Sequence, residues 1–350
     1  MKLTHLIKDL EAVFEQFPDN RSGENSQYEL VDAGMGAFSV FFTQCPSFLA
    51  RQQELKKQKG RSNAEKLFEL REIPSDNQIW NLLDPLDPTQ LGHFYRQTFE
   101  ALEQTGVLKG FRSYSNQLLI ALDGTEYFSS MKIHYENCSQ RILQNGATNY
   151  FHSMLTPVTV QSGNEHVISL EPEFIVPQDG QEKQDCEIQA GKRWLEKKGE
   201  YYAKRGATIL GDDLNSRQPF CQAVKDKHLH FILVFKPDFH ANLYETVEFL
   251  AAQRVLATKV VRKWNGRYGE IHTYRYANQL ALYAEQPALA VNWCELTSTC
   301  EDTGGQLYQN AFVTDFEVTD TCHSPGSGKM PNLLPRSGSL TTLFPFRYLG

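Results

Sequence analysis

Two short apolar runs in this chain each end in aspartate, and these acids are the residues best suited to chemistry. Residues 117–124 read QLLIALDG, so Asp123 follows five apolar residues and precedes a glycine. Residues 207–213 read ATILGDD, so Asp212 and Asp213 close a second run. Carboxylates brought together can bind Mg²⁺ or Mn²⁺, because these hard cations prefer oxygen ligands. Two such ions would activate water or a 3′-hydroxyl and stabilise the leaving oxygen when phosphodiesters are cut and joined.

The two adjacent aspartates are not equivalent as candidates. Successive side chains of a strand point to opposite faces, so Asp212 and Asp213 cannot both face a metal unless the strand has ended. We favour Asp212 because it directly follows the apolar run. A purely structural reading also fits the spacing, in which Asp123 starts a turn and Asp212 caps the helix after it.

Each apolar run predicts a central strand that is covered on both faces. An acid at the end of such a strand lies at the sheet edge where α/β folds place their chemistry. Further strands are predicted at 150–160, 166–170 and 229–235, and helices at 183–198 and 217–224. Three antiparallel strands, a helix, a strand, a helix and a strand is the order of a ribonuclease-H-like core. The fold class expected is therefore α/β with a mixed sheet.

Changes of pattern along the chain suggest five regions. They are a helical N-terminal region at 1–112 that is suited to binding DNA ends, the core at 113–243, a β-rich insertion at 244–290, final core strands at 291–321, and a tail at 322–350. The tail is rich in proline, glycine and serine and has no acidic residue, which predicts a disordered or out-of-frame segment.

Composition limits the function without deciding it. The 350 residues suggest two or three domains, and the formal net charge is −7. An acidic balance argues mildly against a nucleic-acid partner, although basic residues cluster locally. No apolar run is long enough to cross a membrane, and the N-terminus lacks the apolar segment of a signal peptide. Seven cysteines without a repeated spacing suggest reduced thiols and a cytoplasmic location.

Other constellations carry weaker signals. His134, Cys138, Cys186 and Cys221 include no paired C-x-x-C, so zinc is not expected, and no phosphate-binding glycine loop is present.

Candidate DNA contacts are Lys192 and Arg193 on the predicted helix, with Trp264, Arg267 and Arg275 in the insertion. Aromatic side chains stack on bases and arginine holds the nucleic-acid backbone. The alternatives are an ordinary solvated helix face and an ordinary sheet surface.

Several sequence blocks occur together in one order. They are LDGTEYF at 122–128, KQDCE at 183–187 with KRWL at 192–195, LGDDL at 210–214 with QPFC at 218–221, and NWCEL at 292–296 with FVT at 312–314. This order resembles that of a DDE-type transposase of bacterial insertion sequences, over about residues 10 to 320. The resemblance implies a metal-dependent enzyme that nicks transposon terminal inverted repeats and transfers the strand to target DNA. It also implies that Asp123 and Asp212 are the first two metal-binding acids.

The chain departs from that family at the third acid, which is a glutamate on a helix after the last strand. No residue after Asp320 is acidic, as though the reading frame had slipped near Thr321. Glu295 or Glu317 could substitute only if the fold were rearranged. Two main hypotheses follow. One is a DDE transposase by descent that acts with two Mg²⁺ ions and is expected to be inactive as it stands; the other is a non-catalytic remnant that recognises terminal inverted repeats or pairs with an intact copy. An unrelated ribonuclease-H-like nuclease is a third.

Overall fold

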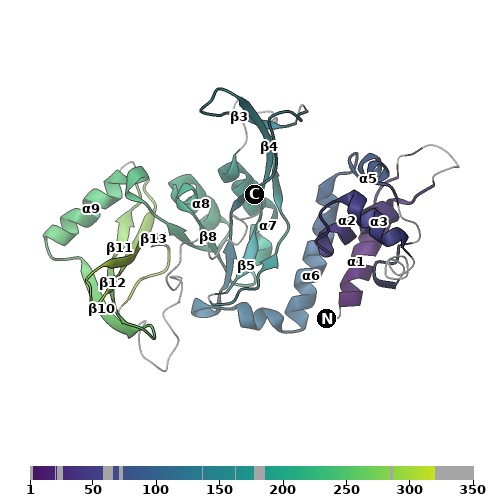
Figure 1. Cartoon of the computed structure of the whole chain (residues 1–350). Coiled ribbons are helices and arrows are strands. Elements are labelled where there is room, and N and C mark those ends of the chain that lie inside the picture. The colour runs from purple at the N-terminus through teal and green to yellow at the C-terminus, as the bar shows by residue number, and fades with distance from the viewer. Residues whose placement is uncertain are drawn as a thin grey trace. The chain divides into compact units, whose positions relative to one another are not determined.

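The computed structural model describes residues 3–19, 21, 27–57, 66–70, 74–135, 137–161, 163–176, 186–283 and 287–319 (Figure 1). The chain divides into two compact units, residues 1–108 and 109–350. Across the described ranges, no helix combines the length and the apolar character that a membrane crossing requires. The tail at 322–350, which was predicted to be disordered or out of frame, lies outside the described residues.

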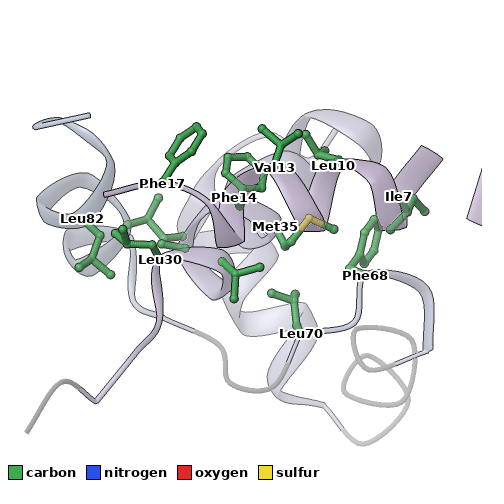
Figure 2. Packing of buried hydrophobic residues seen from close by; sticks show 13 residues of the cluster. Ile7, Leu10, Val13, Phe14, Phe17, Leu30, Met35, Phe68, Leu70 and Leu82 are labelled. Carbon is green, nitrogen blue, oxygen red and sulfur yellow. The ribbon is translucent and has the colours of Figure 1, made fainter. Parts of the chain in front are cut away.

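The first unit is helical, as its sequence pattern predicts. It contains α1 (Leu3–Glu15), α2 (Leu30–Phe42), α3 (Phe48–Lys56), α5 (Asp76–Leu83), the 3-10 turn η1 (Pro88–Leu91) and α6 (Gly92–Gln104), and the turn η2 (Val107–Phe111) follows. Side chains of α1, α2 and α5 form one buried cluster with Phe68 and Leu70 (Figure 2). A Cβ atom on Gly34 would lie 2.5 Å from the Phe14 ring, so glycine is what allows α1 and α2 to pack this closely.

The second unit is built on a nine-stranded mixed sheet in the order β10-β11-β12-β13-β9-β8-β1-β5-β6. Its strands are β1 (Leu118–Ala121), β5 (Val158–Val160), β6 (Ile168–Ser169), β8 (Ala207–Gly211), β9 (His230–Val234), β10 (Ala257–Trp264), β11 (Gly269–Ala281), β12 (Ala290–Cys300) and β13 (Gln306–Thr314). β8 runs parallel to both β1 and β9. All other pairs in the sheet are antiparallel.

The two predicted central strands, β1 and β8, are confirmed, and every residue in them is buried. Helix α7 (Glu187–Ala203) precedes β8, and α8 (Gln218–Asp226) lies between β8 and β9. The side chains of Trp194 and Phe220 on these helices are completely shielded from solvent. The fold is therefore a mixed α/β structure with a mixed sheet, as expected.

The single strand predicted at 150–160 is wrong, because the chain divides there between two sheets. β4 (Thr148–Leu155) pairs with β2 (Gly124–Ser130), β3 (Ser139–Ile142) and β7 (Glu173–Ile175) in a separate four-stranded sheet. Of β4 and β5, only β5, which follows Pro157, pairs with β1 in the large sheet. Proline has no backbone N–H to donate to a ladder, so a strand cannot run through it as a central member.

A helix also replaces part of the region expected to be β-rich. α9 (Ala241–Ala252) occupies the start of the predicted insertion at 244–290, and β10 begins only at Ala257. Leu243 and Val247 are its buried residues. Their spacing of four is helical, and this signal was present in the sequence.

Candidate active site at the ends of two parallel strands

The ends of β1 and β8 bring the two predicted metal-binding acids to the same edge of the sheet. Ala121 pairs with Leu210 in register, and the Leu122 N–H donates to the Leu210 carbonyl at 2.9 Å. Asp123 and Asp212 each lie two residues beyond that pair. Because β1 and β8 are parallel and paired in register, both acids follow strand ends at the same edge of the sheet.

The backbone at Asp123 is held from two sides. Its carbonyl oxygen accepts hydrogen bonds from the N–H of Thr156 at 2.8 Å and from the Thr156 hydroxyl at 3.1 Å. The next N–H in the chain, that of Gly124, donates to Glu187 Oε1 at 2.9 Å. The strand end that carries this half-buried aspartate is therefore fixed by residues 33 and 63 positions away in sequence.

Asp212 has the predicted capping role, and its carboxylate is partly buried, which disfavours its charged form. Its Oδ1 accepts from the Leu214 N–H at 2.9 Å and from Asn215 Nδ2 at 3.4 Å, at the start of the 3-10 turn η4 (Asp213–Ser216). Burial raises the pKa of the Asp212 carboxyl, and the charge of Asp213 adds to the rise, although the two backbone hydrogen bonds oppose it. A cation beside Asp212 would relieve this cost, because opposite charge favours the ionised form.

Asp213, by contrast, belongs to a buried polar network. Its Oδ1 accepts the Lys236 N–H at 2.7 Å and lies 3.6 Å from His240 Nε2. Only 6% of Asp213 is exposed. The carboxylate thus links the end of β8 to the end of β9, whereas Asp212 caps η4. Asp213 remains one of the predicted catalytic residues, but its contacts are those of a structural acid.

Ser216, His240 and Asp213 include the residue types of a nucleophilic triad without its geometry. The Ser216 hydroxyl lies 2.7 Å from His240 Nε2, the same ring nitrogen that Asp213 approaches. A triad needs serine and carboxylate on opposite nitrogens of the imidazole. Ser216 is also fully buried. Burial lowers the pKa of His240, although the charge of Asp213 opposes this, and the ring stacks on Phe235.

Glu187 is a residue that sequence analysis missed. It lies in the first turn of α7, where an acid favours the helix. An acid at a helix start can be recognised in the sequence, but the contact of Glu187 with Gly124 depends on the tertiary fold.

Glu295, considered as a substitute third acid, is 5% exposed on β12 and binds Arg275 Nη2 through both carboxylate oxygens, at 2.8 and 2.7 Å. Glu317 is exposed beyond β13. Within the described ranges no three His, Cys, Asp or Glu side chains form a group that could hold a metal ion. Asp123 and Asp212 nevertheless supply carboxylate oxygens, the donor type that suits Mg²⁺ or Mn²⁺ with water completing the shell.

The residues weighed for zinc are distributed over separate elements. Cys138 Sγ lies 3.4 Å from His152 Nε2 in the small sheet, and His134 packs on the Tyr150 ring. Cys186 precedes α7, and Cys221 is buried in α8, where burial raises its pKa to about 12.

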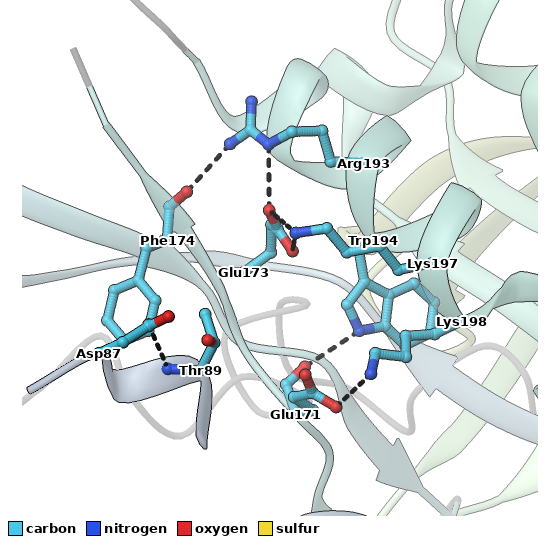
Figure 3. Close-up of polar contacts among 9 residues, drawn as sticks. All are labelled: Asp87, Thr89, Glu171, Glu173, Phe174, Arg193, Trp194, Lys197 and Lys198. Carbon is cyan, nitrogen blue, oxygen red and sulfur yellow. Dashed lines mark hydrogen bonds and ion pairs between the residues drawn. The ribbon is translucent and has the colours of Figure 1, made fainter. Parts of the chain in front are cut away.

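The predicted DNA contacts fall into two groups. On α7, Lys192 is half-buried, while Arg193 donates to Glu173 Oε1 at 3.0 Å and to the Phe174 carbonyl at 2.9 Å. Figure 3 shows Lys197 reaching the same Glu173 carboxylate, so this face of α7 is largely neutralised.

At the β10–β11 turn the basic and aromatic side chains are exposed instead. Trp264 is 71% exposed, and Arg267 also faces solvent. Arg275 lies further along β11, bound to Glu295.

Comparison with known proteins adds no identification: no protein-family model matches the chain, and no curated protein matches it either.

Proposed function

We propose that this protein is a DDE-type transposase by descent, with a ribonuclease-H-like core and an incomplete catalytic centre. The observation that carries the proposal is the register of β1 with β8, which aligns Asp123 with Asp212 at one sheet edge. The strand order β6-β5-β1-β8-β9 supports it, with α7 and α8 before and after β8. Three antiparallel strands followed by two parallel ones, each reached through a helix, is the arrangement expected of that core.

Asp123 and Asp212 would hold Mg²⁺ or Mn²⁺ between them. A bound cation would supply charge stabilisation for an attacking or leaving oxygen of a phosphodiester. The chain's own contribution is to hold both carboxylates at fixed strand ends and to keep Asp212 in a partly dehydrated position that favours a cation. Its substrates would be transposon terminal inverted repeats and target DNA, and it would act in the cytoplasm. A homodimer is the proposed assembly.

The catalytic centre is proposed to be incomplete because the glutamate that the resemblance expects after the last strand has no counterpart after Asp320. Glu295 is committed to Arg275 in the sheet. Residues 321–350 contain no acid. Two carboxylates can retain a cation, but they leave more of its coordination to water than three would, which weakens the site.

The second candidate function is binding of transposon ends without cleavage, and the exposed β10–β11 turn favours it. Lys263, Trp264 and Arg267 all face solvent there. An aromatic ring beside positive charge suits a nucleic acid, because bases stack on the ring and phosphates pair with the cations.

One experiment tests both functions. The full chain is incubated with DNA that carries terminal inverted repeats, with Mg²⁺ or Mn²⁺, beside the variant Asp123→Ala. We expect Mn²⁺ binding that the substitution removes, salt-dependent DNA binding that it leaves intact, and no nicking. Metal-dependent nicking by the parent chain alone would overturn the incomplete centre. Absence of Mn²⁺ binding to the parent chain would overturn the metal site itself.

A further inference from the structure

The peptide group between Asp123 and Gly124 is clamped at both of its polar atoms. Its carbonyl oxygen accepts two hydrogen bonds from Thr156, at 2.8 and 3.1 Å. Its N–H donates to Glu187 Oε1 at 2.9 Å. A peptide group is planar, so fixing its oxygen and its hydrogen fixes the orientation of the whole plane. That plane contains the Asp123 Cα, so the clamp fixes the point from which the Asp123 side chain leaves the backbone.

Glu187 can approach so closely only because residue 124 is glycine. A Cβ atom at Gly124 would lie 2.5 Å from Glu187 Oε2 and 2.7 Å from its Cδ. Any side chain at position 124 would therefore displace the carboxylate and open the clamp. Glu187 itself is held by the first turn of α7, whose N-terminal end carries partial positive charge that favours a carboxylate.

We propose that Glu187 is a positioning residue that holds the Asp123 carboxylate in the direction required to bind a divalent cation with Asp212. The inference rests on the proposed metal site. Glu187 acts through a hydrogen-bond acceptor, not through its charge. A glutamine at 187 would keep an acceptor oxygen for the Gly124 N–H, whereas alanine would remove it.

The test is Mn²⁺ binding to the full chain, measured by calorimetry or electron paramagnetic resonance. Glu187→Ala is expected to weaken Mn²⁺ binding about 10–100-fold, the usual effect of removing a hydrogen-bond partner that orients a ligand. Gly124→Ala is expected to weaken it similarly. Glu187→Gln should stay within about 3-fold of the parent chain, because it retains the acceptor. Glu200→Ala, at an exposed position on the same helix, is the matched control and should leave binding unchanged.

A second measurement does not involve the metal. The Gly124 amide should exchange its hydrogen faster in Glu187→Ala than in Glu187→Gln, because only the alanine variant loses the acceptor. Urea unfolding of each variant identifies any that fails to fold. Slow exchange of the Gly124 amide in Glu187→Gln would then show that the hydrogen bond to residue 187 is retained.

The outcomes separate this inference from the function on which it rests. If Asp123→Ala leaves Mn²⁺ binding unchanged, the proposed metal site fails. If Asp123→Ala abolishes binding while Glu187→Ala leaves it intact, only the positioning role fails. Equal losses in Glu187→Gln and Glu187→Ala would also overturn the positioning role, since the carboxylate charge would then be what matters.

Discussion

Every residue of β8, in the middle of the large sheet, is buried, whereas no residue of β10, at its edge, is buried. The central strand runs parallel to both neighbours, and Thr208 is its one polar residue, as suits a strand covered on both faces. The edge strand carries Lys259, Arg262 and Lys263, and charged side chains on an edge discourage pairing with other chains. The centre therefore fixes the two acids, while the edge is free to present side chains to a partner.

The largest expected effect is at the centre. Ile209 is completely buried in β8, and Ile209→Ala should lower the free energy of unfolding by about 2–5 kcal/mol through lost burial and the cavity left behind. Val260→Ala on β10 is the matched edge substitution, with Val260 58% exposed. Urea denaturation measures both, and equal losses would contradict the contrast between centre and edge.

Arg275→Ala tests a basic residue near the sheet edge that is bound to a buried carboxylate, unlike the exposed basic residues of β10. Glu295 is buried, and removing Arg275 would leave its charge without its main partner, at a cost of about 3 kcal/mol. Glu295→Gln in the same background should recover part of that loss, because the uncompensated charge is gone. If Arg275→Ala unfolds at the same urea concentration as the parent chain, the ion pair is not structural.

Low pH should weaken the network behind the centre. Burial lowers the pKa of His240 below its ordinary 6.5, while Asp213 opposes the shift and Arg217 adds to it. Below pH 6.5 His240 therefore binds a proton more readily in the unfolded chain than in the folded chain. The free energy of unfolding falls as pH falls. The contribution of His240 to the pH dependence fades as pH rises above 6.5, because the unfolded chain then also loses its proton.

The measurement is urea unfolding of the parent chain and of His240→Gln between pH 5 and pH 7. The variant should lose part of the slope below pH 6.5. Burial also lowers the pKa of His152, so some slope of the same sign should remain in His240→Gln. An identical slope in both proteins would exclude His240 as a contributor.

The smallest expected effect on stability is at the exposed turn. Trp264→Ala should change the free energy of unfolding by no more than about 0.5 kcal/mol, because the ring is 71% exposed. The same substitution should weaken DNA binding by about 1–3 kcal/mol if a base stacks on the ring. Gel-shift titration at two salt concentrations measures this, with Tyr127→Ala as a control at another exposed aromatic residue. Unchanged DNA binding in Trp264→Ala would mean that the β10–β11 turn is not the DNA contact, and equal weakening by both variants would mean that the contact is not confined to that turn.

Much of the element pattern could be predicted from apolar spacing. The strands at β1 and β8 and the helix α1 follow from buried-type runs and helical periodicity. Pro157 was read as part of one strand, although proline marks the point where β4 ends and β5 begins in another sheet. α9 was missed because its neighbours suggested strands, while its own Leu243 and Val247 spacing is helical.

The sequence by itself determined that Asp123 and Asp212 each follow a buried strand, because apolar runs and a terminal acid are local features. Only the tertiary structure decided that Ala121 pairs with Leu210 and so brings those acids to one edge. It also separated Asp213 from Asp212 and gave Glu187 its contact with Gly124. These contacts join residues that are far apart in the chain. They form because strand register and helix packing depend on the whole core and not on the local sequence.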